Sequence, residues 1–334
     1  MATLEELLAA MAAIEPLVAP LAPVTGIDVG VRDEEVPNAE DLAIRVFVSS
    51  LGEAPGVEAL VAATAAAFGV PLVVLRRSFS PTSLPDTSIH RPVEGGVSVS
   101  AARFLGSPSG IPVGTLGAIA RTTRTPTPLI VGLSNYHVLC HDANRQFGDE
   151  IIQPEPLPLL GRVPNDHLGQ LVSWAFPEMV YAGTTDAAIC TIEPPFLPII
   201  ADLGPTGGTT TPKIAMLVTK RGRTTGQTFG FISGIGGTYW PDYPTLPPVT
   251  STISGSQTTL REMRDQIQVH IDFPQSIVFL ESGDSGSVLL ESGTNRIVGL
   301  LFASGVDEPG EPIKYALANR ISTVEADLGI TLTL

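Results

Sequence analysis

After residue 97 the chain consists mostly of short apolar or alternating runs bounded by glycine, proline and other turn residues. Runs of this length and with such boundaries are typical of β-strands. They form two groups, separated by the Pro-, Gly- and Thr-rich segment 193–212, and two groups of strands favour paired antiparallel β-barrels of the six-stranded type. The expected strands are 113–121, 128–134, 149–153, 168–175, 185–192, 213–220, 226–233, 266–273, 285–290 and 296–303.

Composition limits the remaining classes of protein. With 33 Gly and 30 Pro among 334 residues, little of the chain can form long helices. The net charge of −15 argues against nucleic acid and against an anionic membrane as partners. No basic residue precedes Arg32, so a signal peptide is not expected. Cys140 and Cys190 are too few for a disulfide framework, which favours reduced thiols in a cytoplasmic protein.

The first 76 residues follow a different pattern. Thr3 and Glu6 form a capping-box motif ahead of apolar residues at helical spacing, and strand-like and helical stretches then alternate up to residue 76. This predicts a small α+β domain at 1–76, a Pro-rich linker at 77–96 and the double barrel at 97–334. The N-terminal domain is a candidate for homo-oligomer contacts. Within the barrels, 236–260 is expected to be a long loop and 315–328 a closing helix.

Three segments contain residues suited to acyl transfer. Ser285 lies in the sequence Gly-Asp-Ser-Gly, a turn whose backbone amides can point at one spot beside a hydroxyl nucleophile. Taken alone, it is equally an ordinary polar turn. A serine needs a base, and His137 follows an apolar run, whereas the other four histidines are interpreted as structural or exposed. Asp186 is a lone acid ahead of an apolar run, where burial requires a partner such as the second imidazole nitrogen.

The segments Ser-Asn-Tyr-His-Val-Leu, Thr-Asp-Ala-Ala-Ile and Ser-Gly-Asp-Ser-Gly-Ser resemble, in this order, the His, Asp and Ser motifs of trypsin-like (chymotrypsin-fold) serine peptidases. The resemblance covers residues 96–330. It implies that Ser285 is the nucleophile, His137 the general base and acid, and Asp186 the residue that fixes the imidazole tautomer. The amides of Gly283 and Ser285 would form the oxyanion hole. By the same resemblance, the substrate pocket would involve Phe279, Phe302 and Ala303.

A further turn resembles one subgroup of this family, whereas the segment before 111–116 differs from the secreted members. Lys220–Gly226 is similar to the Gly-Arg-Thr-Thr-Gly turn of a subgroup that includes bacterial trypsin-like proteins and plant proteins of the Narrow Leaf type. The alternative is a solvated turn that offsets local acidity. In secreted digestive relatives a new amino terminus pairs with the acid before the nucleophile, but no basic residue stands just before 111–116 to mark a processing site. Asp284 therefore needs another partner.

The combined expectation is a serine endopeptidase that cleaves protein or peptide substrates through an acyl-enzyme intermediate. A small or apolar P1 residue is expected, because the pocket positions supply no acid for a Lys or Arg side chain. Two alternatives stay open: an inactive barrel scaffold that binds proteins, and an esterase that uses the same triad. No cofactor or metal is expected, because the sequence contains neither metal-ligand spacing nor a complete phosphate loop.

Overall fold

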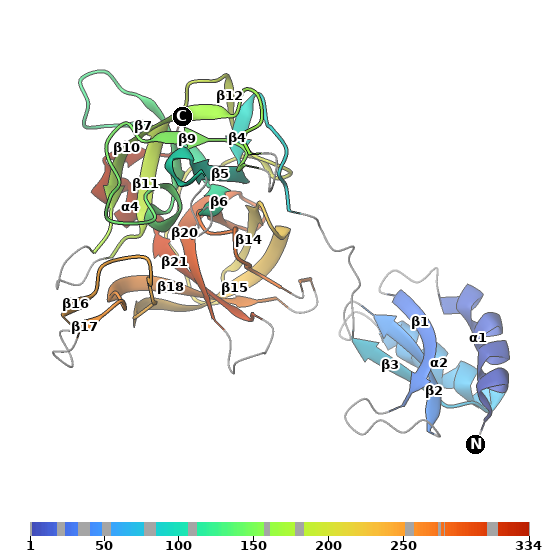
Figure 1. Ribbon diagram of the computed structural model, residues 1–334. Coiled ribbons are helices and arrows are strands. Elements are labelled where there is room, and N and C mark those ends of the chain that lie inside the picture. Colours follow the sequence, from blue (N-terminus) through green and yellow to red (C-terminus); the bar gives the residue numbers. More distant parts are fainter. Residues whose placement is uncertain are drawn as a thin grey trace. The chain divides into compact units, whose positions relative to one another are not determined.

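The computed structural model describes residues 2–18, 24–32, 41–48, 55–76, 85–105, 112–156, 161–177, 184–250, 257–272, 275–276, 278–305 and 313–333. The chain, drawn in Figure 1, divides into two compact units: residues 1–82 with 273–277, and residues 83–272 with 278–334. Within the described ranges, no helix has the length and apolar character needed to cross a membrane.

The first unit is a three-stranded sheet packed with two helices. Its strands lie in the order β1-β2-β3, with β1 antiparallel and β3 parallel to β2. A parallel pair needs a crossover, and α2 supplies it. The core joins Leu7 and Ile14 of α1 with Ile44 and Val46 of β2. The elements are α1 (Leu4–Val18), β1 (Val24–Val31), β2 (Leu42–Val48), α2 (Pro55–Phe68) and β3 (Leu72–Arg76).

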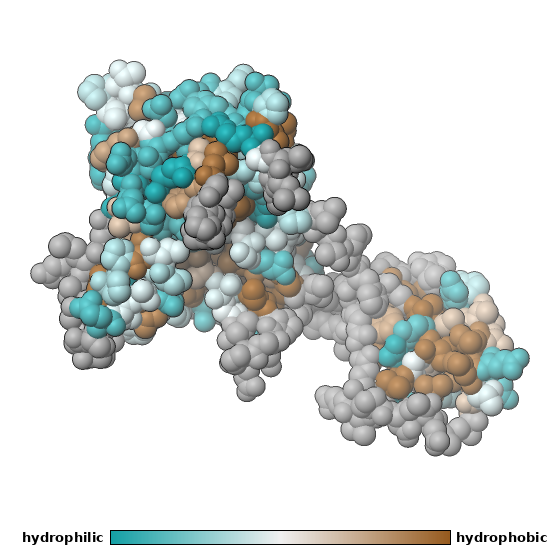
Figure 2. Space-filling view, in the orientation of Figure 1, coloured by the Kyte–Doolittle hydropathy of each residue, from teal (hydrophilic) through white to brown (hydrophobic). Residues whose placement is uncertain are grey.

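The start of α1 is a capping box, as the sequence predicts. The Thr3 amide donates to a Glu6 carboxylate oxygen at 2.8 Å, and the Glu6 amide donates to the Thr3 hydroxyl at 3.3 Å. These hydrogen bonds hold the pKa of Glu6 below its usual value. The helix exposes Leu4, Leu8 and Leu17, and Figure 2 shows apolar side chains gathered on this unit.

The second unit begins with an eight-stranded sheet in the order β22-β7-β8-β11-β10-β9-β5-β6. Only Gly117 separates β6, at one edge, from β7, next to the other edge, so the sheet curls round on itself. The strands are β5 (Val97–Ala101), β6 (Val113–Leu116), β7 (Ala118–Thr122), β8 (Ile130–Ser134), β9 (Glu150–Ile152), β10 (His167–Ala175), β11 (Ala187–Thr191) and β22 (Ile330–Thr331).

Six further strands close into a barrel in the order β14-β15-β18-β21-β20-β19. All its strand pairs are antiparallel, and apolar side chains such as Val218, Ile232 and Leu289 fill the interior. The strands are β14 (Leu217–Gly222), β15 (Gly226–Tyr239), β18 (Met263–Ile271), β19 (Val288–Glu291), β20 (Arg296–Gly305) and β21 (Tyr315–Arg320). The predicted fold class, mainly β with two barrel-like sheets behind a small α+β part, is confirmed.

Three expectations about elements differ from the structure. The run 113–121 is divided by Gly117, where a Cβ would lie 2.2 Å from the Gly286 carbonyl oxygen. The segment 315–328 is not one helix, because β21 occupies its first half and pairs with β18 and β20 before α4 (Ile321–Leu328) begins. The loop expected at 236–260 is shorter at its start, since β15 continues to Tyr239.

The remaining elements are short and lie outside the two large sheets. Near the start of the second unit, β4 pairs with β12 in parallel, and β12 pairs with β13. These elements are β4 (Val93–Gly95), η1 (Ala102–Phe104), α3 (Tyr136–Leu139), β12 (Phe196–Ile200), β13 (Gly204–Pro205), β16 (Val249–Thr250) and β17 (Gln257–Thr258). Residues 251–256 of the expected loop lie outside the described residues.

Candidate active site

Two adjacent strands bring His137 and Asp186 together. Strand β8 leads into the single-turn helix α3, which carries His137, and Asp186 immediately precedes β11, the antiparallel partner of β8. Nδ1 of His137 lies 2.7 Å from Oδ2 of Asp186, and the His137 amide donates to Oδ1 at 3.3 Å. A carboxylate at Nδ1 selects the tautomer whose Nε2 can accept a proton, so the pair has the geometry of a general base with its orienting acid.

The Asp186 side chain is fully buried, so its charge depends on neighbouring donors. The Tyr243 hydroxyl donates to Oδ2 at 2.8 Å. The Asn135 side-chain amide donates to the Asp186 carbonyl at 2.7 Å, and the Asp186 amide donates to Oδ1 of Asn319 at 3.0 Å. Asn319 lies on β21 of the closed barrel, so both barrels hold this acid.

Ser285 lies in a turn that requires its two glycines. Gly283 has φ +98° and Gly286 has φ +96°, values in the left-handed region that favours glycine. The turn is attached to β6, because the Thr115 amide donates to the Ser285 carbonyl at 2.8 Å and the Thr115 hydroxyl donates to the Gly283 carbonyl at 2.9 Å. The Ser285 residue itself is partly exposed.

The backbone amides of this turn alternate in their bonding. The Asp284 amide donates to the Glu281 carbonyl at 3.0 Å, and the Gly286 amide donates to the Leu301 carbonyl at 2.9 Å. Among the described residues, the amides of Gly283 and Ser285 have no acceptor. Two unpaired amides, one of the serine itself and one two residues before it, are what an oxyanion hole requires.

The turn and the histidine helix pack against the same residue of β6. A Cβ added to Gly114 would meet the Val138 side chain at 2.4 Å and the Ser285 carbonyl oxygen at 2.9 Å, so only glycine leaves room for both. No hydrogen bond between the Ser285 hydroxyl and the His137 imidazole occurs in the described part of the chain. In unliganded enzymes such contacts are often long and tighten only when substrate binds.

Asp284 has the partner that the sequence left open. The Lys220 ammonium on β14 lies 3.0 Å from its Oδ2, and both side chains are 0% exposed. Oδ1 accepts the amides of Thr224 and Thr225 at 2.8 and 3.1 Å, while Oδ2 also accepts the Thr225 hydroxyl and the Glu281 amide. Burial would raise the pKa of Asp284, but Lys220 and these donors outweigh it and hold that pKa below its usual value.

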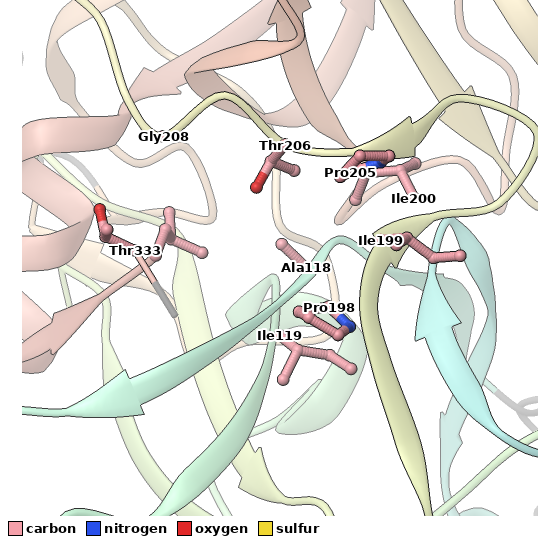
Figure 3. Close-up of a pocket in the computed structure, with 10 residues that line it drawn as sticks. Ala118, Ile119, Pro198, Ile199, Ile200, Pro205, Thr206, Gly208 and Thr333 are labelled. Atoms are coloured by element: carbon pink, nitrogen blue, oxygen red, sulfur yellow. The ribbon is translucent and has the colours of Figure 1, made fainter.

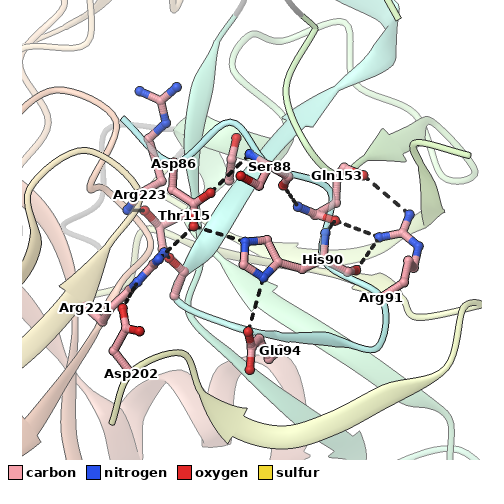
Figure 4. Close-up of polar contacts among 12 residues, drawn as sticks. Asp86, Ser88, His90, Arg91, Glu94, Thr115, Gln153, Asp202, Arg221 and Arg223 are labelled. Atoms are coloured by element: carbon pink, nitrogen blue, oxygen red, sulfur yellow. Dashed lines mark hydrogen bonds and ion pairs between the residues drawn. The ribbon is translucent and has the colours of Figure 1, made fainter. Parts of the chain in front are cut away.

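Residues 85–94, near the start of the second unit, contact the turn 220–226, which also holds Asp284 (Figure 4). Arg221 lies 2.7 Å from Asp86 and 3.2 Å from Asp202, and the Asp86 amide donates to the Arg223 carbonyl at 2.7 Å. Burial alone would raise the pKa of Asp86. The hydrogen bonds from His90 and Arg221 outweigh burial and hold this pKa well below its usual value. The Arg223 guanidinium pairs with Glu155, so both arginines are paired within the fold and do not form a solvated turn.

His90 lies between two carboxylates. Its Nε2 is 3.0 Å from Asp86 and its Nδ1 is 3.1 Å from Glu94, so a protonated ring would satisfy both (Figure 4). The hydrogen bond to Asp86 is the main reason why the pKa of His90 is raised.

The expected pocket residues lie in different environments. Phe279 is fully buried in the core of the closed barrel, packed with residues such as Val218 and Val269. Phe302 is buried on β20, and Ala303 beside it is partly exposed.

Two cavities occur elsewhere. One, of about 200 Å³, is lined mainly by apolar residues of β7, β12 and the chain's last described residues (Figure 3); the other, of about 270 Å³, lies beside the start of β14. None of the candidate catalytic or pocket residues lines either cavity.

The two cysteines are buried, and they are not joined in a disulfide. Burial raises the pKa of Cys190 to about 12 and that of Cys140 further, so both are unreactive thiols at neutral pH. Within the described ranges, no group of three or more His, Cys, Asp or Glu residues is arranged to hold a metal ion.

Comparisons with known proteins give fold-level similarity. No protein-family model matches the sequence, and no curated protein matches it. Similar solved structures include a chymotrypsin of Cellulomonas bogoriensis (15% identity, TM-score 0.43), a Nocardiopsis protease (15%, 0.46) and Thermobifida fusca protease A (13%, 0.46). Each alignment covers 72% of this chain and 97% of the other. At such identities and TM-scores the similarity carries no argument about activity, which rests on the site itself.

Proposed function

We propose that the protein is a serine endopeptidase of the chymotrypsin type, with Ser285, His137 and Asp186 as its catalytic triad. The observation that carries the proposal is the combination of the hydrogen bond from His137 to the buried Asp186 with a serine turn that has two unpaired amides. A structural histidine needs no such turn beside it, and an ordinary turn serine needs no oriented base.

The chemistry follows from these positions. The Ser285 hydroxyl attacks the scissile carbonyl carbon while His137 Nε2 takes its proton, and the amides of Gly283 and Ser285 stabilise the oxyanion that forms. Collapse of this intermediate breaks the C–N bond, the imidazolium gives its proton to the leaving amine, and an acyl-enzyme remains. Water then attacks the ester with His137 again as base, which releases the acid and restores the serine. Asp186 stabilises the imidazolium in both halves of the reaction.

A preference for a small or apolar P1 residue is part of the proposal. Phe302 and Ala303 on β20 are apolar, and neither they nor Phe279 supplies a charge for a basic or acidic side chain. The attachment of Asp284 to Lys220 within the same chain supports activity without proteolytic processing before β6. The Gly-Arg-Thr-Thr-Gly sequence of the turn 220–226 supports membership of the narrower subgroup of bacterial and Narrow Leaf-like proteins.

His137, Asp186 and Ser285 all belong to the second unit, and we assign the first unit a role in assembly. Three exposed leucines on α1 support contact with a second copy of the chain. Light scattering of the full chain and of a Leu4→Ser/Leu8→Ser/Leu17→Ser variant tests this: a dimer or larger species that becomes a monomer in the variant is expected, and identical masses would contradict it.

Hydrolysis of a peptide library by wild-type protein and by Ser285→Ala tests the proposed activity. Removal of the nucleophile of such a triad costs on the order of 10⁶-fold in kcat. Loss of cleavage in a folded variant is expected, whereas a decrease of less than about tenfold would contradict the assignment. Cleavage of activated esters but not of peptides would favour the esterase, and no turnover of either would favour the binding scaffold.

A further inference from the structure

Tyr243 is a second-barrel residue that touches the acid of the first barrel. It lies in the segment between β15 and β18, is 7% exposed, and its hydroxyl donates a hydrogen bond to Oδ2 of Asp186, the oxygen that also lies 2.7 Å from His137 Nδ1. The two donor distances are nearly equal, 2.8 and 2.7 Å. We propose that Tyr243 is a positioning residue for catalysis, which fixes the Asp186 carboxylate and limits how strongly that carboxylate stabilises a protonated His137. This inference rests on the proposed function.

The surroundings of Tyr243 hold its ring in one place. Its ring meets the ring of Phe176 edge-on at 4.9 Å and that of His137 at 6.1 Å. Its amide donates to the Thr259 carbonyl at 3.2 Å, and the Leu246 amide donates to its carbonyl at 3.0 Å. The hydroxyl is therefore delivered to Asp186 by a packed segment with its own hydrogen bonds.

The segment that carries Tyr243 makes a second contact near His137, in the loop that follows α3. The Thr245 hydroxyl donates to the His141 carbonyl at 3.0 Å, and an Arg261 guanidinium nitrogen donates to the Pro247 carbonyl at 2.6 Å. Segment 240–247 thus spans from the closed barrel to the loop that follows α3. Its position and the orientation of Asp186 are linked through one hydroxyl.

The hydroxyl remains a donor at every pH at which an enzyme assay is practical. Burial, and then the charge of Asp186, raise the pKa of Tyr243 well above its usual value of 10. Among the described residues, the charged and titratable groups that interact with Tyr243, Asp186 or His137 include Arg261, His141, Cys140 and Tyr136. Among these, His141 is a second imidazole, whose pKa burial holds below its usual value, so it is the group to be distinguished from His137 in a titration.

The predicted effect of losing the hydroxyl has a definite sign. A hydrogen bond to a carboxylate disperses its charge, so without Tyr243 Oη–H the carboxylate stabilises the imidazolium more strongly. His137 then loses its proton at higher pH. In Tyr243→Phe, the midpoint of the acidic limb of kcat/KM should move upward by roughly half a pH unit. At the plateau, kcat should fall about tenfold with KM little changed, because the Asp186 carboxylate is no longer held in the orientation that His137 needs.

Tyr239→Phe is the matched control. Tyr239 ends β15 four residues earlier, is partly exposed and does not contact Asp186, so the same substitution there should leave both the midpoint and kcat unchanged. In an Asp186→Asn background, Tyr243→Phe should cause no further loss, because the carboxylate on which it acts is absent.

A second measurement is independent of turnover. In Ser285→Ala protein, the His137 ring titration followed by NMR should move upward on adding Tyr243→Phe, with His141→Gln included to assign the signals. If Ser285→Ala still cleaves peptides, the proposed function fails, while this titration still tests the link. If Ser285 is essential but Tyr243→Phe changes only thermal stability and moves neither midpoint, Tyr243 is merely structural and the inference is overturned.

Discussion

Replacement of Lys220 by methionine removes a charge from a fully buried pair while keeping most of the side-chain volume. The ammonium lies 3.0 Å from Asp284, and no water-exposed surface remains on either side chain. Removing one partner of a buried ion pair costs about 3–5 kcal/mol, because the other charge is left without compensation. Asp284 keeps hydrogen bonds from Thr224, Thr225 and Glu281, which places the expected cost near 3 kcal/mol, toward the lower end of that range.

This loss of stability can be measured for the second unit separately from the first. Both tryptophans of the chain, Trp174 and Trp240, belong to it, so intrinsic fluorescence follows its unfolding and not that of the first unit. For a unit of this size, a loss of about 3 kcal/mol lowers Tm by roughly 6–12 °C. Lys213→Met, at an exposed lysine ahead of the same strand, is the matched control and should unfold with the wild type.

The penalty should depend on pH in a definite direction. In the wild type the pKa of Asp284 is lowered below its ordinary 3.8, so its charge contributes stability above that pH and the contribution is lost as pH falls through the folded-state value. In Lys220→Met the buried carboxylate has no cation and takes up a proton more readily. The difference in Tm should therefore be full at pH 7 and narrow toward pH 4.

Activity should fall together with stability, because Asp284 lies between the two oxyanion amides. Loss of one well-placed oxyanion donor costs about 10²–10³ in kcat, and a loosened turn should approach this range. The assay is the rate at which a fluorophosphonate labels the folded variant at 25 °C. If Lys220→Met unfolds within about 1 °C of the wild type and is labelled at the same rate, the pair neither stabilises the barrel nor positions the serine turn.

Three further changes are predicted. Asp186→Asn should lower kcat about 10⁴-fold at pH 7, because the amide stabilises the wrong imidazole tautomer; near-normal turnover would refute its role. Gly283→Ala, whose Cβ would lie 2.5 Å from the Thr224 hydroxyl, should lose labelling as well as stability, whereas Gly293→Ala, with φ +82° in open space, should lose stability only. His90 has a raised pKa, so the stability difference between wild type and His90→Gln should be full below pH 6.5 and shrink as pH rises through the folded-state value, as thermal unfolding across pH 5–8 would show.

The strand pattern was sufficient to predict most of the barrels, because turn residues bound nearly every strand. The pattern did not predict the elements whose type or bounds depend on contacts with residues far away in the sequence. Residues 97–101 were not among the expected strands, although their sequence Val-Ser-Val-Ser-Ala alternates; β5 is buried on both faces, so its two serines are core residues and not a solvent face. The segment 315–328 combines a strand and a helix without a glycine or proline between them, and only pairing with β18 and β20 decides where one ends.

The same distinction applies to the site. His137 and Asp186 could be proposed from three short motifs, and the structure brings them into contact through the β8–β11 pairing. Tyr243 and Asn319 could not, because their roles depend on how segments far apart in the sequence meet. Lys220 could be seen in the sequence as a lysine ahead of a Gly-Arg-Thr-Thr-Gly turn. Its burial beside Asp284 could not be predicted, because it depends on the tertiary packing of the serine turn against β14.

The central claim is that Ser285 is a nucleophile activated by His137. Peptide mapping by mass spectrometry after reaction with a fluorophosphonate tests it most directly, because the reagent adds to the serine oxygen only where a base and an oxyanion hole assist. We expect one modified residue, Ser285, in the full-length wild-type chain, and no modification in folded His137→Ala or Ser285→Ala. An unmodified Ser285 in folded wild-type protein, or equal labelling after His137→Ala, would contradict it.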